Sequence, residues 1–484
     1  MGNVLVREES LKDIADAIRE KRKSSVSFKP SEMAGEIRLI ETGGTEPPDE
    51  GLPVRFFGRE GELLYSYSYE EVEQMTELPP LPVCAGLVCQ DWNWTLEEIK
   101  TAGRKVDVGA VFITDDGSTR IYVTLLESAL EPCVGFAQSK ANGVLVDWGD
   151  GSSLESSELE GEENFVSMPH RYEQAGEYVI RLIPEGGAEL YLSGNSSTSK
   201  LLHNQSADGK YSPMYAGTIK KVELGKGITS LGTRAFYCQN LEEITIPEGV
   251  TVLQDAFYMS RSLKNLTVPS GVTDIAANAF RSCFSLERLI LPNGIKSMGS
   301  YAFSECQSLR RITLPGKTTV LESNLFRQCQ SLKEIVVPYG VTEIGNSAFA
   351  VCNCLERLVI PETVRKISSS AFSNCVCLRQ VRLPSRLDKI ESSLLQNCSG
   401  LAEMRIPGKV NYVLSAAFGY CTGIENYYFY SSVPPSLSSS NTFQSMNASC
   451  RIHVPKGSLE AYQTANLWSD LAERMVEMEE GEVY

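Results

Sequence analysis

A motif of 23 residues is repeated along the second half of the chain, and no other feature constrains the fold as strongly. The working pattern is AF-x-x-C-x-x-L-x-x-I-x-L-P followed by a Gly-Val-Thr-x-Ile segment. The prolines mark the period, with a first step of 22 residues and later steps of 23, at Pro247, Pro269, Pro292, Pro315, Pro338, Pro361, Pro384 and Pro407. The aromatic position of the motif recurs nine times, at Phe236, Phe257, Phe280, Phe303, Phe326, Phe349, Phe372, Leu395 and Phe418.

The repeat length predicts a solenoid over residues 218–430. One copy is too short to bury its own Phe, Leu and Ile, whereas stacked copies bury them as continuous columns. The segment L-x-x-I-x-L-P fits a short strand that ends at proline, because proline cannot donate a hydrogen bond within a sheet. Successive strands would lie about 4.8 Å apart in a parallel sheet.

Half of the 14 cysteines fall three residues after the aromatic position, and the period explains them. They are Cys283, Cys306, Cys329, Cys352, Cys375, Cys398 and Cys421. We expect a buried column of small apolar side chains, which is a common environment for free cysteine. Cys354 and Cys377 form a second, shorter column. The alternative is a metal site built from the C-x-C pairs Cys352/Cys354 and Cys375/Cys377.

The nine copies resemble the BspA-like (type 5) leucine-rich repeat. This resemblance implies a binding or structural role and carries no catalytic residues. The segment Cys450–Met475 resembles the strand-Pro-helix-Trp unit that closes such arrays. We therefore expect residues 431–484 to form a C-terminal cap over the last coil.

The outward face of the predicted strands is the candidate binding surface. Strand alternation places the second x of L-x-x-I-x-L and the x after Ile on that face. These positions predict a basic stripe that could hold phosphate or carboxylate groups, made of Arg288, Arg311, Arg357, Arg382 and Arg405. Tyr428, in the aromatic run 427–430, could stack on a sugar. The alternatives are a solvated face with scattered charges and an aromatic run packed against the cap.

The first 41 residues predict a pair of short amphipathic helices, one after Ser10 and one starting at Pro30. The segments Leu11–Lys21 and Lys29–Ile37 resemble a module at the start of phage tail and baseplate-associated proteins. This resemblance implies an attachment role for residues 1–41. Residues 42–51, rich in Gly, Pro and acidic residues, read as a linker.

Two further modules are expected before the repeats. Residues 52–112 predict a small α+β module in which Trp92 and Trp94 belong to the core and Thr95 caps a helix. Ile113–Leu125 carries an Asp-Gly hairpin signal. Val144–Ser153 and His170–Leu182 resemble the polycystic-kidney-disease (PKD) β-sandwich, an immunoglobulin-like spacer, which we place at residues 113–197 and follow with a linker at 198–217. Within its WGDGS turn, Asp147 and Asp150 could hold Ca²⁺, although turn stabilisation is the favoured interpretation.

Charge and motif content restrict the remaining functions. The net charge of −16 argues against general nucleic-acid binding, although residues 218–430 alone carry +6. The chain has three histidines, at positions 170, 203 and 453, and none belongs to a metal-ligand or catalytic motif. The longest apolar run is too short for a transmembrane helix, and the first residues do not resemble a secretion signal. We expect no enzyme activity, no cofactor and no resident metal.

These features predict a multidomain architecture: a leucine-rich-repeat solenoid of parallel β-strands with short helical or turn segments, preceded by the sandwich, the α+β module and the helical pair. The leading functional hypothesis is a phage tail-associated receptor-binding protein, made in the host cytoplasm and carried on the virion. Its repeats would contact a host cell-surface glycan or protein, and residues 1–41 would contact other tail or baseplate proteins. The alternatives are a bacterial surface or secreted adhesin and a structural virion decoration protein, and a homo-oligomer is compatible with all three.

Overall fold

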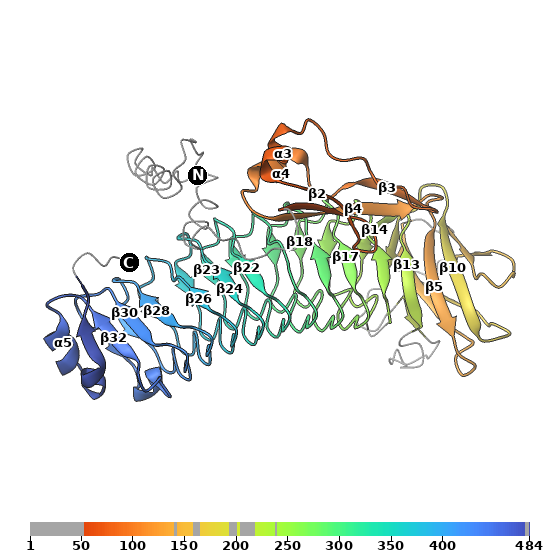
Figure 1. The fold of residues 1–484 in the computed structure, drawn as a ribbon. Coiled ribbons are helices and arrows are strands. Elements are labelled where there is room, and N and C mark those ends of the chain that lie inside the picture. Colours follow the sequence, from red (N-terminus) through yellow and green to blue (C-terminus); the bar gives the residue numbers. More distant parts are fainter. Residues whose placement is uncertain are drawn as a thin grey trace.

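The structure is a computed structural model that describes residues 53–139, 143–157, 165–192, 201–203, 218–237, 240–479 and 484. The expected helical pair at residues 1–41 and the linker at 42–51 lie outside the described residues. Figure 1 shows an elongated solenoid with a β-sandwich at one end, a cap at the other, and the small α+β module lying along one side. No described helix is long and apolar enough to cross a membrane.

The solenoid contains two rows of short parallel strands. The front row comes from the L-x-x-I-x-L segments: β13 (Ile219–Glu223), β15 (Glu243–Thr245), β17 (Asn265–Thr267), β19 (Arg288–Ile290), β22 (Glu334–Val336), β24 (Arg357–Val359), β26 (Gln380–Val381), β28 (Glu403–Ile406), β30 (Asn426–Phe429) and β32 (Arg451–Val454). The second row comes from the Gly-Val-Thr-x-Ile segments: β14 (Ile228–Leu231), β16 (Val252–Leu253), β18 (Asp274–Ile275), β20 (Ser297–Met298), β21 (Val320–Leu321), β23 (Glu343–Ile344), β25 (Lys366–Ile367), β27 (Lys389–Ile390), β29 (Tyr412–Val413) and β31 (Ser436–Leu437).

The register of the strands follows the sequence period, so the predicted parallel solenoid is confirmed. Arg357 pairs with Gln380, and Glu343 pairs with Lys366, each 23 residues further on. Within a front strand the side chains alternate as expected: Leu358 is 4% exposed, whereas its neighbours Arg357 and Val359 are partly exposed.

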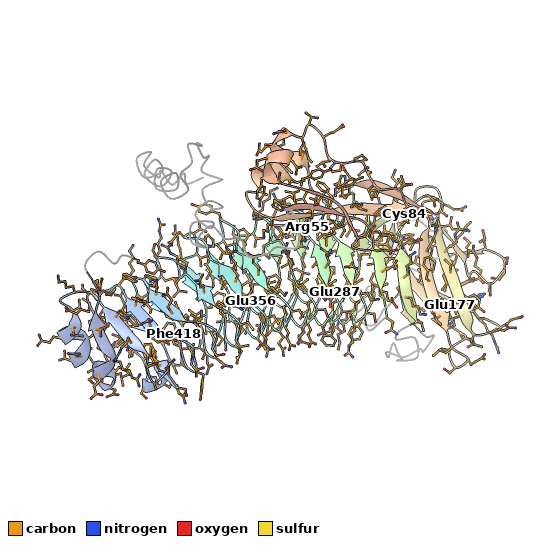
Figure 2. All side chains as sticks on the ribbon, in the orientation of Figure 1. Arg55, Cys84, Glu177, Glu287, Glu356 and Phe418 are labelled. Carbon is orange, nitrogen blue, oxygen red and sulfur yellow. The ribbon has the colours of Figure 1, made fainter. Side chains whose placement is uncertain are left out.

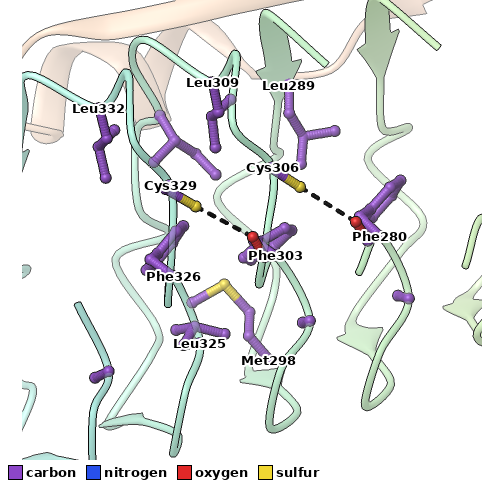
Figure 3. Packing of buried hydrophobic residues seen from close by; sticks show 14 of the residues in the cluster. Phe280, Leu289, Met298, Phe303, Cys306, Leu309, Leu325, Phe326, Cys329 and Leu332 are labelled. Carbon is purple, nitrogen blue, oxygen red and sulfur yellow. Dashed lines mark hydrogen bonds between the residues drawn. The ribbon is translucent and has the colours of Figure 1, made fainter. Parts of the chain in front are cut away.

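Columns of identical side chains fill the space between the rows, as the period predicts. The rings from Phe257 to Phe372 stack coil on coil, with centroids 5.1–5.8 Å apart. Each thiol of the main cysteine column donates to a backbone carbonyl of the preceding coil, and Cys329 Sγ donates to Phe303 O at 3.1 Å (Figure 3). Burial raises the pKa of these thiols, that of Cys306 to about 12. The column is therefore a structural element of neutral, hydrogen-bonded thiols.

The β-sandwich continues directly into the solenoid. Its strands are β5 (Thr119–Leu125), β6 (Cys133–Gln138), β7 (Val144–Asp147), β8 (Glu155–Ser156), β9 (Phe165–Pro169), β10 (Gly176–Pro184), β11 (Leu190–Leu192) and β12 (Leu202–His203). β5 pairs antiparallel with β13, and β11 pairs parallel with β14. One hydrophobic core runs from the sandwich through the coils to the cap.

This continuity differs from the expected arrangement of a spacer joined to the repeats by a linker. The first coil would otherwise expose two unpaired strand edges and the open ends of its apolar columns. The two sandwich sheets satisfy both, so they close the solenoid as an N-terminal cap. β12 falls inside the segment 198–217 that was expected to be a linker, and it pairs with β6.

The α+β module has its own small core and a mixed four-stranded sheet in the order β2-β1-β4-β3. Its elements are β1 (Val54–Phe57), β2 (Leu63–Tyr67), α3 (Tyr69–Gln74), β3 (Leu87–Trp92), α4 (Leu96–Thr101) and β4 (Val106–Thr114). Both helices begin with a capping box, Ser68 with Glu71 and Thr95 with Glu98, so the predicted cap at Thr95 is confirmed. Trp92 and Trp94 are buried, as predicted.

The expected hairpin at Ile113–Leu125 is wrong, because β4 and β5 belong to different sheets. The Asp-Gly turn carries the chain from the module into the sandwich. Asp116 accepts hydrogen bonds from the backbone N–H and the hydroxyl of Ser118, which stabilises the turn locally. The end of β4 is bound to the first coil instead of to β5, because Thr114 N donates to Leu224 O at 3.2 Å.

The last coil is closed as the sequence predicts. The elements are η2 (Ser440–Phe443), α5 (Leu459–Thr464), η3 (Ser469–Arg474) and β33 (Met475–Glu477), and β33 pairs with β32. Trp468 is 1% exposed and packs on Phe429 and Phe443 at the end of the core. Its indole donates to Pro435 O at 2.7 Å, so burying this large ring leaves its N–H satisfied.

Candidate functional site

The α+β module covers the first part of the front row. β4 lies across β15, β17 and β19. The fully buried Asn93 amide donates to Val268 O at 2.9 Å, and the Trp94 indole donates to Leu291 O at 2.8 Å. Gly109 faces Thr267 so closely that a Cβ atom at this position would lie 2.3 Å from the threonine hydroxyl. The module is therefore fitted to these coils by shape as well as by hydrogen bonds.

Arg288, the first residue of the predicted basic stripe, lies beneath the module. Its guanidinium is 4.0 Å from the ring centre of Phe57, and its Nη1 is 3.8 Å from Asp107, which also binds Arg55 through two hydrogen bonds. Arg55 marks this boundary between module and solenoid in Figure 2. Burial lowers the pKa of Arg288. Arg288 thus belongs to the interface, and Arg311, its bridge partner in the next coil, is partly buried.

Beyond these strands the described residues of the module no longer lie on the front row. We call the outward residues of that part the open face, on which the Tyr484 ring lies against Arg382. Its members come from β22, β24, β26, β28, β30 and β32 and from Arg382, which directly follows β26: Glu334, Val336, Arg357, Val359, Gln380, Arg382, Glu403, Arg405, Asn426, Tyr428, Arg451 and His453. Four arginines stand against two glutamates, so the open face is basic although the whole chain is acidic.

The arginines of the open face alternate with acceptors and aromatic rings. Arg357 Nε lies 3.6 Å from Glu334 on the neighbouring strand, and Arg405 Nε donates to Glu403 at 3.0 Å. Arg382 lies over the ring of Tyr484 at 5.4 Å. The predicted basic stripe therefore also contains acidic and aromatic side chains. Each of these three guanidinium groups is held in position by one of these neighbours.

An aromatic cluster occupies the cap end of the open face. Tyr428 stacks on His453 with ring centres 4.4 Å apart, and the Arg405 guanidinium lies 4.6 Å from the Tyr428 ring centre. His453 Nε2 is 2.9 Å from Asn426 Oδ1. Tyr427 and Phe429 point the opposite way and are buried, as strand alternation requires. Of the aromatic run 427–430, Tyr428 thus faces outward.

Sequence reasoning missed His453 and Asn426 as members of this cluster. The signal was present, because the front-row register continues into β32, where Tyr428 pairs with His453. Tyr428 and His453 are 25 residues apart rather than 23, so the repeat period alone does not predict that they lie side by side.

A hollow of about 210 Å³ lies where the module meets the first coils. Glu223 lines this hollow, and its carboxylate accepts from Arg59 at 3.2 Å and from Tyr122 at 2.9 Å and lies 2.7 Å from Lys221. Burial favours a raised pKa for Glu223, but the hydrogen bonds and charges of these partners outweigh it and lower the pKa. The Glu223 carboxylate is already paired with Arg59 and Lys221, so we interpret this network as a structural contact between the module and the first coils.

Other sequence candidates have structural partners. Asp147 and Asp150 accept backbone hydrogen bonds from Gly149 and Ser152, both at 3.0 Å, and His170 Nε2 lies 2.7 Å from Asp150. In the C-x-C pairs, Cys352 and Cys375 are buried while Cys354 and Cys377 are exposed, so the two thiols of each pair point apart. Among the described residues, no group of three or more His, Cys, Asp or Glu side chains is arranged to hold a metal ion.

Comparison with known proteins identifies the repeats. The model of the BspA type leucine-rich repeat region matches residues 205–256, 252–376 and 342–464. No curated protein matches the chain. Three similar solved structures each cover between a third and just over half of this chain.

A leucine-rich repeat protein of T. pallidum is 33% identical, with 33% of this chain and 77% of that chain covered and a TM-score of 0.32. A leucine-rich repeat protein from Bacteroides ovatus is 22% identical, with 55% and 86% covered and a TM-score of 0.35. The pneumococcal vaccine antigen PcpA is 20% identical, with 53% and 71% covered and a TM-score of 0.38. By its matching repeats, which span more than half of its length, this chain belongs to the BspA-type leucine-rich repeat family.

Proposed function

We propose that this chain is a non-enzymatic adhesion protein whose open face binds an anionic ligand on a cell surface. The observation that carries the proposal is the division of the front row. Among the described residues, the module covers the strands from β15 to β19, whereas the strands from β22 to β32 present a basic and aromatic surface on which Tyr484 contacts Arg382. A rigid, repetitive surface of this kind suits a ligand that is itself extended and repetitive.

The chemistry of the open face favours a phosphate- or carboxylate-bearing glycan. Arg357, Arg382 and Arg405 can each present a planar fork of donors to an oxyanion. Tyr428 and His453 offer a stacked pair of rings beside Arg405, which could support the apolar face of a sugar. Because the arginines are already positioned by neighbours, less side-chain entropy is lost on binding.

We further propose that the protein acts in a phage tail, with residues 1–41 attaching it to tail or baseplate proteins and the open face directed at the host. The support is the resemblance of Leu11–Lys21 and Lys29–Ile37 to tail-associated modules. Immunogold labelling of purified virions would place the protein on the tail. Labelling of the bacterial surface without labelling of virions would favour a bacterial adhesin instead.

The binding test uses the full-length chain labelled with a fluorophore and a panel of candidate host cells. The test variant carries Arg357→Gln, Arg382→Gln and Arg405→Gln. The control variant carries Lys366→Gln, Arg386→Gln and Lys389→Gln, which remove the same charge from exposed positions outside the front row. We expect selective staining that falls at least tenfold in the test variant, survives in the control, and weakens with added salt.

Equal loss in both variants would show that net charge, and not the open face, drives attachment. Absence of staining by the unmodified chain on every strain would overturn the adhesion proposal and leave a structural role on the virion.

A further inference from the structure

Two exposed cysteines occupy the same repeat position in neighbouring coils. Cys354 and Cys377 are both exposed and free, in contrast to the buried cysteine column beside them. The other coils carry Asn, Ser or Gly at this position, namely Asn240, Ser262, Ser285, Ser308, Ser331, Gly400 and Gly423. Burial and packing explain the main cysteine column, but they do not explain thiols at a solvent-facing position.

The backbone fixes these two coils against each other on both sides of the cysteines. Before them, Val351 N donates to Ser373 O at 2.8 Å. After them, Arg379 N donates to Glu356 O at 3.2 Å, and Arg357 pairs with Gln380 in the parallel ladder. Cys354 and Cys377 lie in turns between these fixed points, so we expect them to keep the spacing of the adjacent coils. That spacing is about 4.8 Å in a parallel ladder, which lies within the roughly 4.4–6.8 Å between Cα atoms that a disulfide spans.

We infer that Cys354 and Cys377 form a redox-sensitive dithiol site that closes to a disulfide between adjacent coils when it meets a low-molecular-mass disulfide such as oxidised glutathione. One thiolate attacks a sulfur atom of the small disulfide, which forms a mixed disulfide and releases one small thiolate. The second protein thiolate then attacks the protein sulfur of that mixed disulfide and releases the second small thiolate. The two cysteines lose two electrons, the small disulfide gains them, and the two thiol protons pass to the released thiolates.

The disulfide would join two coils at the edge of the open face. Cys354 lies three residues before Arg357, and Cys377 lies three residues before Gln380. In an oxidising environment the disulfide would fix the spacing of β24 and β26. In a reducing environment only the backbone hydrogen bonds between the two strands would hold it. The site is independent of the ligand proposed for the open face.

The test treats the folded full-length chain with oxidised glutathione, blocks remaining thiols with an alkylating agent after denaturation, and maps the peptides by mass spectrometry. We expect one internal cross-link between the peptides of Cys354 and Cys377, with the loss of two hydrogen atoms. Cys354→Ser, which restores the residue of four other coils, should abolish the cross-link and leave Cys377 carrying glutathione.

Two designed pairs check the spacing. In the Cys377→Ser background, Ser331→Cys places a thiol one coil from Cys354 and should cross-link. Ser308→Cys in the same background places the thiol two coils away, at roughly 10 Å, and should not. The inference is overturned if Cys354 and Cys377 stay alkylatable, if each ends with its own glutathione, if they link different chains, or if the two-coil pair cross-links equally well.

Discussion

At the residue scale, the coils depend on backbone conformations that most side chains avoid. Each of the coils from Phe280 to Phe418 contains a left-handed residue immediately before the cysteine column. The position holds Asn374 and Asn397 in two successive coils, but Val351 in the coil before them, with φ of 64°. A β-branched side chain in this region is strained, because its Cβ substituents crowd the backbone.

Replacing Val351 with Asn should therefore stabilise the protein. Asn adopts the left-handed region at little cost, and the Val351 N–H bond to Ser373 O would be kept. We expect the free energy of unfolding to rise by about 0.5–1 kcal/mol through relief of this backbone strain. The gain stays this small because the half-buried Val side chain gives up some apolar contact. The measurement is the urea concentration at the midpoint of the unfolding transition of the middle coils.

Ser347→Asn is the matched control, since Ser347 is also left-handed, with φ of 52°, but is not β-branched. Its gain should be smaller than that of Val351→Asn. A loss of stability in Val351→Asn would mean that the contacts of the Val methyls outweigh the backbone strain.

The residue scale also shows why most of the solenoid could be predicted. Phe326, Cys329 and Leu332 each meet their own repeat equivalents in the next coil, so the period supplies the contact as well as the element. Arg288 shows the limit of this reasoning. Its outward position follows from the alternation, but its partners Phe57 and Asp107 lie far away in the sequence and outside any repeat.

At the scale of elements, the docking of β4 on the front row was beyond prediction for the same reason. The Asp-Gly turn at Asp116–Gly117 suggests a hairpin, because a turn signal reports local conformation alone. Whether the strands on either side pair with each other depends on which edges compete for them. β4 inserts between β1 and β3, and β5 pairs with β10 and β13, so tertiary pairing overrides the local signal.

Asn93 offers a direct test of this docking. Its amide donates to Val268 O and accepts from Gly109 N at 2.8 Å, so it joins the module's β4 to the solenoid. Asn93→Leu keeps a similar volume but leaves these buried backbone groups without their partner. We expect docking to weaken by about 2 kcal/mol, which corresponds to roughly 30-fold faster hydrogen exchange in β17 and β19.

The peripheral contact between Arg104 and Asn293, at 3.5 Å, supplies the control for this experiment. Asn293→Ala should change the same exchange rates less than threefold. If Asn93→Leu left the protection of β17 and β19 unchanged, the module would not be an integral part of the solenoid face, and the boundary of the open face would have to be redrawn.

At the scale of the whole molecule, acid-sensitive groups gather at one end. Among the described carboxylates, those with a lowered pKa are Asp116, Asp150, Glu223 and Asp274, all in the sandwich or the first coils. For Asp150, burial tends to raise the pKa, but hydrogen bonds from Ser152 and His170 prevail and lower it to about 2. A lowered pKa in the folded state means that the charged form is stabilised by folding.

The sign of the pH effect follows from this shift. These carboxylates stabilise the folded state fully above their pKa in the unfolded chain, near pH 4. The stabilisation is lost as the pH falls through their pKa values in the folded state, towards about pH 2. We therefore expect the sandwich end to unfold in acid before the cap end. The four tryptophans allow the two ends to be followed separately, because Trp148 lies in the sandwich core and Trp468 in the cap.

Incorporation of 5-fluorotryptophan and ¹⁹F NMR between pH 6 and pH 2 would test this order. The Trp148 signal should move to its unfolded position at a higher pH than the Trp468 signal. Asp150→Asn removes the titrating charge, so this variant should be less stable at pH 6 and should lose less on acidification. Loss of the Trp468 signal first would contradict the expected order, because the cap end would then be the more acid-sensitive. Loss of both signals together would show that the shared core makes the molecule unfold as one unit, with the carboxylates of the sandwich exerting no local control.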